Sequence, residues 1–201
     1  TDGLSDGVWC EKCQTWLTPQ TPIPAGHTFV DGYCTVCGMI EGADMRFKIS
    51  TQREEDGSVG GRIIRRDGAE GEKIILPNLV YDAGTESMVP VTVLSGELFK
   101  YDSKLRKIVI PDTVTTIENS AFNMAGLTSV VIPDSVVTIG LQAFALCTGL
   151  EDIKIGDSVI SIGENAFYGC SSIKELYLGK NVESISKAAF YQCGTIVKRF
   201  E

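Results

Sequence analysis

Four cysteines near the N-terminus have the spacing of a metal-binding site. Cys10 and Cys13 form one CxxC pair, Cys34 and Cys37 form a second, and twenty residues separate the two pairs. A CxxC pair on a tight turn directs two thiolates at one tetrahedral centre, and two such turns complete a structural zinc site. The sequence therefore predicts a zinc ion with a structural role, held by Cys10, Cys13, Cys34 and Cys37.

The segment around these cysteines, residues 1–42, lacks the apolar periodicity of a hydrophobic core. It is rich in Gly, Pro and Thr, and Gly32 and Gly38 flank the second cysteine pair, where a metal-binding turn requires unusual backbone angles. The segment resembles a zinc ribbon. Two disulfides are the alternative, which a secreted chain would permit. His27 could replace one ligand, although beside four cysteines we interpret it as a solvated loop residue.

Three further cysteines recur once per repeat and need a separate explanation. They are Cys147, Cys170 and Cys193. Stacked turns would bring their thiols close together, yet three in a row cannot all pair as disulfides. Because free cysteine behaves as a small buried hydrophobic residue, we expect reduced, buried thiols with no redox or metal chemistry.

Other residues offer little for catalysis. His27 is the only histidine and lies in the cysteine-rich segment. A Ser-His-Asp or Cys-His arrangement would therefore have to include this residue. The glycine-rich run from Gly57 to Gly61 is not followed by the Lys-Ser or Lys-Thr of a phosphate-binding loop. The sequence indicates that the protein is not an enzyme. The contrary hypothesis would need a pocket near residues 43–90.

Charge and hydropathy argue against two further kinds of partner. The net charge is −8 and the isoelectric point is about 4.8, whereas nucleic-acid binding needs clustered Lys and Arg. No apolar run approaches the ~18 residues needed to span a bilayer. We expect no nucleic-acid partner and no membrane insertion. Residue 1 is Thr rather than Met, which fits either removal of a signal peptide or trimming of the chain.

Downstream of the cysteine-rich segment, a repeat of about 23 residues organises the chain. The phrase from Gly156 to Cys170 restates the phrase from Pro133 to Cys147. One phenylalanine marks each repeat: Phe99, Phe122, Phe144, Phe167 and Phe190. Self-similarity at such a period marks a solenoid, because each unit buries its apolar face only against its neighbours. The sequence therefore predicts stacked turns around one continuous core.

Each repeat contains a short segment that alternates like a β-strand. In residues 150–156, Ile153 and Ile155 should point inward, and Asp152 and Lys154 outward. Successive turns would lay these strands side by side as a parallel sheet on one face, with a short helix or 3₁₀ turn around each phenylalanine on the opposite side. The predicted fold class is a β-rich α/β solenoid, a curved, right-handed leucine-rich-repeat solenoid with ~23-residue turns.

Residues 43–88 precede the regular repeats and are interpreted as an irregular β cap with a first turn. Phe47 and Ile49 alternate with polar residues, which predicts a strand. Residues 62–66 and 72–76 flank a turn-forming Asp-Gly, which predicts a hairpin. The chain thus divides into a cysteine module at 1–42, this cap at 43–88 and five solenoid turns at 89–201.

The phrase Ile-Pro-Asp-Ser-Val-x-x-Ile-Gly-x-x-Ala-Phe-x-x-Cys, found from Ile132 to Cys147, resembles the BspA-type leucine-rich repeats of bacterial surface proteins. The resemblance covers roughly Val89 to Glu201. It implies a non-catalytic module, secreted or at the cell surface, that serves adhesion and protein binding. The zinc-ribbon-like N-terminus does not belong to this repeat pattern, so a cytoplasmic location stays open.

The outward residues of the predicted sheet are the candidate binding site. One column holds more apolar residues than a solvated strand face requires, and exposed apolar patches framed by charges often mark binding sites. The predicted contact residues are Val109, Val131, Asp152, Lys154, Glu175 and Tyr177. Their partner would be a protein or a glycan bound at the concave sheet face. Ordinary β-propensity is the alternative explanation of the apolar column. The alternative function makes the zinc module the interaction element and the solenoid a spacer.

The sequence leaves the register of the last turn open. Ile196 fits a 23-residue turn, which would place Lys198 beside Glu175 on the outward face, whereas Phe200 fits a 22-residue turn. Either register makes the final strand polar, as a terminal cap requires. Because an exposed sheet edge can pair with a second molecule, weak self-association through the C-terminal edge is a further expectation.

Overall fold

The computed structural model describes residues 8–10, 15–17, 29–30, 33–34, 40–44, 46–53, 56–66, 71–82, 84–194 and 197–200. For residues 8–34, 65–66 and 197–200 this description covers the backbone alone. Within these ranges every regular element is a β-strand or an isolated bridge, and no helix occurs.

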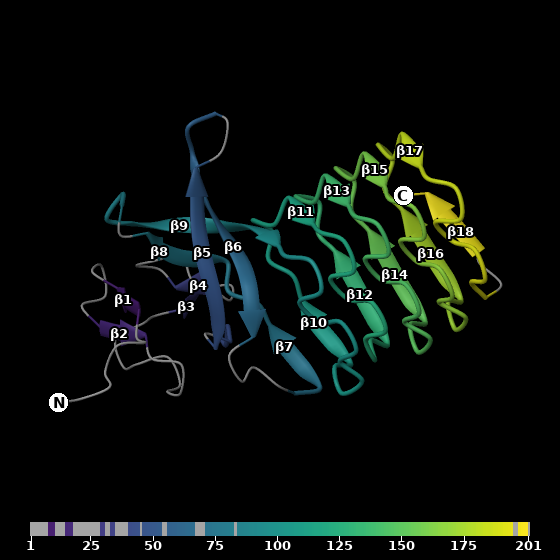
Figure 1. Ribbon diagram of the computed structural model, residues 1–201, viewed down its shortest axis with the longest axis horizontal. Helices are drawn as coiled ribbons and strands as arrows, with labels where there is room; N and C mark the ends of the chain where they lie inside the picture. The colour runs from purple at the N-terminus through teal and green to yellow at the C-terminus, as the bar shows by residue number, and fades with distance from the viewer. Residues whose placement is uncertain are drawn as a thin grey trace.

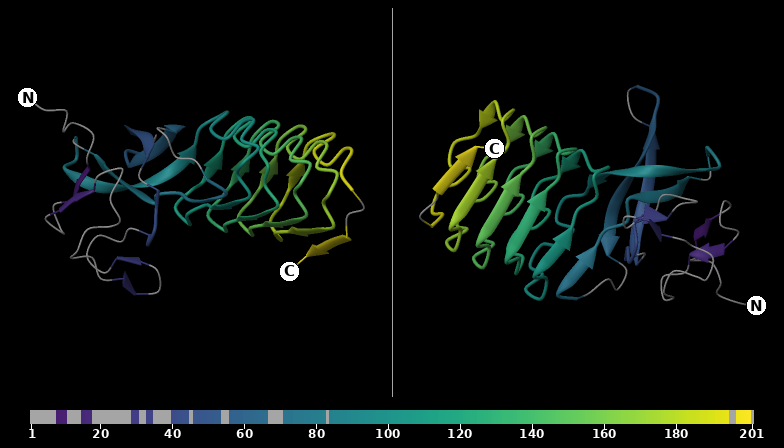
Figure 2. Two further views of the ribbon diagram at one scale, coloured as in Figure 1. Left: turned by 90° about the horizontal axis from the view of Figure 1, so that it is seen from below. Right: turned by 180° about the vertical axis from the view of Figure 1, so that it is seen from behind.

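Most of the chain winds into a solenoid that stacks along one axis (Figures 1 and 2). Its longer strands form a parallel six-stranded sheet in sequential order. These strands are β7 (Lys73–Ile75), β10 (Lys107–Val109), β12 (Ser129–Ile132), β14 (Asp152–Ile155), β16 (Glu175–Leu178) and β18 (Val197–Phe200). In β14, Ile153 and Ile155 are buried while Asp152 and Lys154 are exposed, so the predicted alternation is confirmed. The predicted ladder of parallel strands is confirmed as well.

A second sheet, which was not predicted from the sequence, runs along another side of the solenoid. Its solenoid strands are β9 (Ser87–Leu94), β11 (Thr116–Ile117), β13 (Thr138–Ile139), β15 (Ser161–Ile162) and β17 (Ser184–Ile185), paired in parallel. Four of these strands hold only two residues, too few for an alternation with period two to be visible in sequence. Ile117, Ile139 and Ile162, each five residues before a phenylalanine of the repeat, are buried within these short strands.

The N-terminal end of this second sheet holds longer strands. β5 (Phe47–Arg53) pairs antiparallel with β6 (Val59–Arg66), and β6 pairs in parallel with β9. β8 (Leu79–Asp82) pairs antiparallel with β9. Further towards the N-terminus, β1 (Val8–Cys10) pairs with β2 (Thr15–Leu17), and β3 (Phe29–Val30) pairs with β4 (Tyr33–Cys34).

The hairpin predicted between residues 62–66 and 72–76 is wrong. β6 belongs to the second sheet, whereas β7 joins the six-stranded sheet beside β10. The register sets Ile74 opposite Ile108 and Ile75 opposite Val109. Burial of Ile74 and Leu76 under the first turn outweighs the local turn signal, because a turn sequence favours a chain reversal without specifying which strands pair.

The loop around each phenylalanine forms the third side, and the short helix or 3₁₀ turn predicted there is wrong, because these residues form hydrogen-bonded turns without helix. The residues two before and two after each phenylalanine adopt left-handed backbone angles, as Gln142 (φ 53°) and Leu146 (φ 58°) do around Phe144. Such residues interrupt a helix. The Phe144 N–H therefore donates to the Ala166 carbonyl of the next turn, at 2.7 Å, instead of closing a helical turn.

The phenylalanine column is the centre of the core. The rings of Phe99, Phe122, Phe144 and Phe167 are fully buried, and consecutive centroids lie 4.8 to 5.2 Å apart with planes within 6° of parallel. A fifth ring, Phe190, stacks on Phe167 at 5.1 Å but is only half-buried. Such offset stacks add about 0.5–1.5 kcal/mol each to the burial of apolar area.

Cysteines close the core beside this column. Cys147 and Cys170 are buried, Cys193 is half-buried, and all three are free thiols. Each thiol donates to a phenylalanine carbonyl of the preceding turn: Cys147 to Phe122, Cys170 to Phe144 and Cys193 to Phe167, at 3.1 Å in each case. The prediction of reduced thiols is confirmed, with Cys193 less buried than expected. Burial raises the pKa of Cys193 to about 11, with the neighbouring Cys170 thiol as a smaller cause, so the thiol is neutral at pH 7.

Candidate binding face

The outward side chains of the six-stranded sheet, here called the sheet face, form two columns that run along the solenoid. Strand register aligns Ser129 with Asp152 and Asp152 with Glu175 in the first column. In the second, Val131 lies beside Lys154 and Lys154 beside Tyr177. Neighbouring parallel strands are about 4.8 Å apart. The six predicted contact residues therefore share one continuous surface.

The second column changes character along the solenoid. Val109 is 40% exposed and Val131 61% exposed, so apolar surface is open to solvent at two successive strands. The next two positions hold Lys154, which is exposed, and Tyr177, which is half-buried. The Tyr177 hydroxyl donates to Glu175 Oε2 at 2.6 Å, and this bond holds the phenol against the first column.

A shallow pocket of about 70 Å³ lies at the edge of the sheet face, where β14 and β16 end and their following turns begin. Its lining residues are Asp134, Lys154, Ile155, Asp157, Tyr177, Leu178 and Gly179. Aromatic, cationic and anionic groups thus surround one small hollow. Asp134 and Asp157 were not among the predicted contact residues, although aspartate recurs after Pro133 and after Gly156 at the same place in consecutive turns.

These aspartates form a ladder between turns. The Asp157 N–H donates to Asp134 Oδ1 at 2.9 Å, and the Lys180 N–H donates to Asp157 Oδ1 at 3.1 Å. The Lys180 ammonium also pairs with Asp157 Oδ2, and this contact is the largest cause that holds the pKa of Asp157 below 3.8. Asp157 is therefore a carboxylate at neutral pH and presents a fixed negative charge at the pocket rim.

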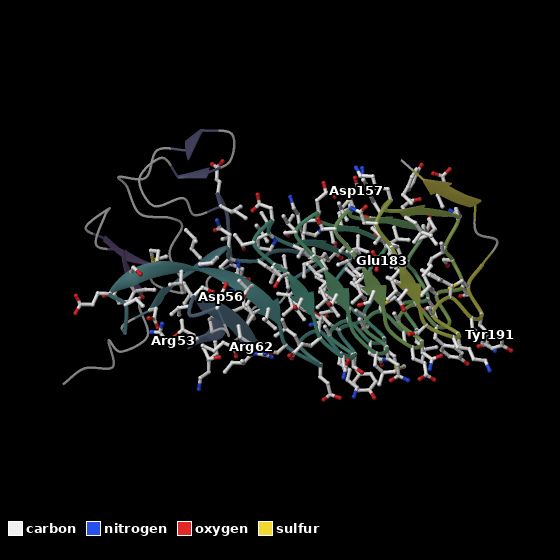
Figure 3. All side chains as sticks on the ribbon, turned by 90° about the horizontal axis from the view of Figure 1, so that it is seen from above. Arg53, Asp56, Arg62, Asp157, Glu183 and Tyr191 are labelled. Carbon is white, nitrogen blue, oxygen red and sulfur yellow. The ribbon has the colours of Figure 1, made fainter. Side chains whose placement is uncertain are left out.

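Close approach of the turns makes this ladder possible. A Cβ built at Gly179 would lie 2.2 Å from the Gly156 carbonyl oxygen, a distance that no side chain tolerates. Glycine at this position therefore lets the backbone of one turn reach the aspartate of the turn before it. Figure 3 shows Asp157 on the side of the solenoid opposite Tyr191.

The register of β18 corrects one member of the first column. Val197, not Lys198, pairs with Glu175, and Arg199 pairs with Tyr177. Phe200 pairs with Leu178, so the last turn has the 22-residue spacing. The sequence is compatible with a 22-residue and a 23-residue last turn. Ile196 fits one spacing and Phe200 the other, so the sequence does not choose between them.

The four predicted zinc ligands lie outside the residues whose side chains are described. The backbone places Cys10 at the end of β1, where it pairs with Thr15, and Cys34 at the end of β4, where it pairs with Phe29. Cys13 and Cys37 fall outside the described residues altogether. Among the side chains that are described, no three His, Cys, Asp or Glu residues gather into a metal-binding group.

The sheet face suits recognition by shape and charge. The side chains that the structure describes include no histidine, and the thiols of Cys147, Cys170 and Cys193 donate to backbone carbonyls of the preceding turns. Lys154, Asp157 and Tyr177 can bind polar or charged groups, and Val109 and Val131 can bury apolar ones. No helix in the described ranges is long and apolar enough to cross a bilayer.

Comparison with known proteins relates the repeats to one family. The family model described as "BspA type Leucine rich repeat region (6 copies)" matches residues 92–200. A comparison with curated proteins gives no significant match.

Several solved structures are also similar to the chain. A leucine-rich repeat protein from Bacteroides capillosus is 26% identical, with a TM-score of 0.47, over 75% of this chain and 94% of that one. A leucine-rich repeat protein from Eubacterium ventriosum is 19% identical, with a TM-score of 0.58, over 80% of this chain and 41% of that one. The pneumococcal vaccine antigen PcpA is 17% identical, with a TM-score of 0.55, over 78% of this chain and 48% of that one. The last two support the solenoid fold, and the chain spans less than half of each.

Proposed function

Because this chain belongs to the family of BspA-type leucine-rich repeat proteins, we propose that it is a non-catalytic adhesion module that binds a protein or glycan partner through the sheet face. The observation that carries the proposal is the second column, where exposed Val109 and Val131 adjoin Lys154 and Tyr177. An apolar stripe next to charged and aromatic groups is typical of a binding surface.

The first column supports the same conclusion through its charge. It begins with Lys73 and Lys107, passes through Ser129 to Asp152 and Glu175, and has Val197 as its last member. A partner with the opposite distribution of charge would bind in one orientation only, because like charges placed together cost free energy. The pocket beside Tyr177 adds a place where a partner side chain or a sugar ring can insert.

We also propose that the chain acts outside the bacterial cell, secreted or at the cell surface. Its fold resembles that of a pneumococcal protein described as a vaccine antigen. The family resemblance in the repeat phrase from Ile132 to Cys147 implies the same location. Three reduced thiols in the solenoid are compatible with this location, because two of them are buried and each is occupied in a hydrogen bond to a carbonyl.

Paired variants test the sheet face. Val131→Asp places a charge in the exposed apolar column, whereas Val137→Asp makes the same change at a site that is 37% exposed and precedes β13 in the second sheet. We expect the purified chain to bind members of a glycan array or of a panel of purified extracellular-matrix proteins. Val131→Asp and Tyr177→Ala should weaken that binding at least about tenfold, an effect of ~1.4 kcal/mol, while Val137→Asp leaves it unchanged.

Two results would count against this proposal. Binding that survives both Val131→Asp and Tyr177→Ala in a folded protein would move the site away from the sheet face. Failure of the wild-type chain to bind any member of either panel would contradict an adhesion role for these residues. Circular dichroism and a thermal melt of each variant establish that the fold is intact.

The alternative function assigns binding to the cysteine module, with the solenoid as a spacer. We propose in addition that Cys10, Cys13, Cys34 and Cys37 hold one structural zinc ion. Each CxxC pair starts on the last residue of a short hairpin strand, a place where a metal-binding turn commonly follows a strand. Metal content by mass spectrometry tests this site: one zinc per chain supports it, and four oxidised cysteines contradict it.

Substitution of Cys13 and Cys37 by Ser in the full chain separates the two functions. Loss of ligand binding with an intact solenoid would favour the cysteine module as the interaction element. Unchanged binding would leave the sheet face as the contact surface and give the zinc ion a structural role only.

A further inference from the structure

The loop side of the solenoid carries an apolar stripe that is separate from the sheet face. Its members recur once per turn just after the phenylalanine and are here called the loop stripe: Tyr101, Met124, Leu146 and Tyr168. The first three are 64%, 44% and 37% exposed, and Tyr168 is half-buried. Figure 3 shows Tyr191, whose ring stacks on that of Tyr168, on the side of the solenoid opposite Asp157. The loop stripe and the sheet face therefore lie on different sides of the solenoid.

Hydrogen bonds between turns fix the backbone of the loop stripe. The Met124 N–H donates to the Ala145 carbonyl at 2.8 Å, and the Leu146 N–H donates to the Tyr168 carbonyl at 2.6 Å. Tyr101 makes the equivalent bond to the second turn at 2.9 Å. Neighbouring members of the stripe are thus one turn apart, which is about 4.8 Å where strands pair, and they form one continuous surface.

Three stripe residues keep their side chains at a cost to the backbone. Tyr101, Met124 and Leu146 have φ angles of 62°, 57° and 58°, and such left-handed angles cost free energy in any residue with a Cβ. The fourth turn has Gly169 at the same position, with a φ of 70°, and glycine adopts these angles without that cost. The loop can therefore form without a side chain here, and a contact made by these side chains would account for their presence.

The surroundings of the loop stripe are uncharged in three successive turns. Residues 119–126, 141–149 and 165–172 contain no Asp, Glu, Lys or Arg, although these types make up 22% of the chain. In the first loop, Lys100 pairs with Glu97, and its ammonium lies 5.4 Å from the centroid of the Tyr101 ring. Depletion of charge together with exposed Tyr and Met is typical of the core of a protein–protein interface.

The aromatic rings favour a protein over a glycan as the occupant. A sugar packs its C–H groups on the open face of a ring, whereas Tyr191 covers one face of Tyr168, with centroids 6.0 Å apart and planes 20° apart. Lys100 likewise lies over the Tyr101 ring. Net charge then favours a second copy of the chain. Each copy has a charge of −8, so two copies repel least where they meet on a side without charged residues.

We propose that two copies of this chain associate back to back through the loop stripe, in antiparallel orientation about a two-fold axis at Leu146. Met124 and Tyr168 lie one turn from Leu146 in opposite directions, so the axis sets Met124 of each copy against Tyr168 of the other. Contacts between a methionine sulfur and an aromatic ring are favourable. Such an interface is isologous and closes after two copies. It leaves both sheet faces open, so the dimer presents the proposed binding surface twice.

The antiparallel orientation follows from the same residues. In a parallel pair each stripe residue would face its own counterpart, and the contacts between Met124 and Tyr168 would be lost. The charged first loops of the two copies, which include Glu97 and Lys100, would also lie against each other. Reversal of one copy sets each first loop beside the far end of the other solenoid instead.

Sedimentation velocity of the full chain tests the proposal. The wild type should convert from monomer to dimer with a dissociation constant on the order of 10 µM, as expected for a small interface. Leu146→Asp should weaken the dimer at least about tenfold, because it brings two carboxylates together at the axis, and aspartate tolerates left-handed backbone angles. Val137→Asp is the matched control. Val137 is also 37% exposed but precedes β13 in the second sheet, so this variant should dimerise like the wild type.

Single cysteines test the orientation. Leu146→Cys should form a disulfide between copies when oxidised glutathione is added, because the axis sets this residue against its own counterpart. Met124→Cys should not, because its counterpart lies two turns away. Peptide mapping identifies the linked peptides, and circular dichroism of each variant establishes that the fold is intact.

Several results would overturn this inference. A wild-type chain that stays monomeric at every concentration excludes the dimer, and loss of binding to the matrix-protein panel in Leu146→Asp would then assign the loop stripe to a different protein. A dimer that persists in Leu146→Asp, or that Val137→Asp weakens equally, places the interface elsewhere. Disulfide formation by Met124→Cys as complete as that by Leu146→Cys contradicts the antiparallel orientation. These measurements need no ligand, so they are independent of the outcome at the sheet face.

Discussion

Phe144→Ala should be among the most destabilising single changes in this protein. Phe144 is fully buried, and its ring lies between those of Phe122 and Phe167, with centroids 4.8 and 5.2 Å away. Burial of a phenylalanine side chain contributes about 2 kcal/mol. A void of roughly 100 Å³ at about 24 cal/mol per Å³ adds about 2 kcal/mol more if the turns do not collapse into it. Loss of two stacked contacts, at about 0.5 kcal/mol each, brings the expected cost to about 5 kcal/mol, the upper end of the range for Phe→Ala changes in protein cores.

Phe190→Ala is the matched control for this prediction. Phe190 is half-buried and stacks on Phe167 alone among the described rings. We expect it to cost about half as much as Phe144→Ala. The comparison keeps the substitution constant and changes only the position in the column, so it isolates the effect of burial between two turns.

Urea unfolding followed by far-ultraviolet circular dichroism measures both variants. The m-value must be reported with each free energy of unfolding, because a solenoid can lose its terminal turns before its centre. A drop in m for Phe190→Ala would mean that the last turn unfolds separately. A cost below about 2 kcal/mol for Phe144→Ala, or a larger cost for Phe190→Ala, would refute the description of the column as one continuous core.

Three further predictions concern the turns around this core. Gly163→Ala should lower the free energy of unfolding in urea by about 1–3 kcal/mol, because its new Cβ would lie 2.7 Å from the Gly140 carbonyl carbon. Gly149→Ala, with a nearest contact of 3.5 Å, should be nearly neutral. Equal losses of stability in the two variants would contradict this packing. Cys193 should react with iodoacetamide in the native protein at a rate that rises about tenfold per pH unit from pH 7 towards its pKa of about 11. Peptide mapping can measure this rate, and Cys147 and Cys170 should react only on unfolding. A reaction rate that levels off near pH 8 would contradict the raised pKa. Lys180→Ala should raise the pKa of Asp157 towards 3.8 in a carboxyl NMR titration, since the Lys180 ammonium is the largest cause of its lowering; an unchanged pKa would assign that effect to the backbone N–H alone.

The candidate binding face could be predicted from sequence because it depends on alternation within a strand. Once Ile153 and Ile155 are inward, Asp152 and Lys154 must be outward, and the repeat carries this assignment to Val131 and Tyr177. The pocket beside Tyr177 could not be predicted in the same way. Its Asp157 rim depends on how closely two turns approach at Gly179, and no periodicity within one turn encodes that distance.

The solenoid, its core columns and the exposed face follow from the amino-acid sequence alone, because a residue type that recurs every turn has the same environment in every turn. The second sheet, the left-handed loops around each phenylalanine and the pairing of Phe200 with Leu178 are visible only in the folded chain. These features depend on hydrogen bonds between turns, such as that from the Phe144 N–H to the Ala166 carbonyl. The partners of such a bond lie on different turns, and stacking alone brings them together.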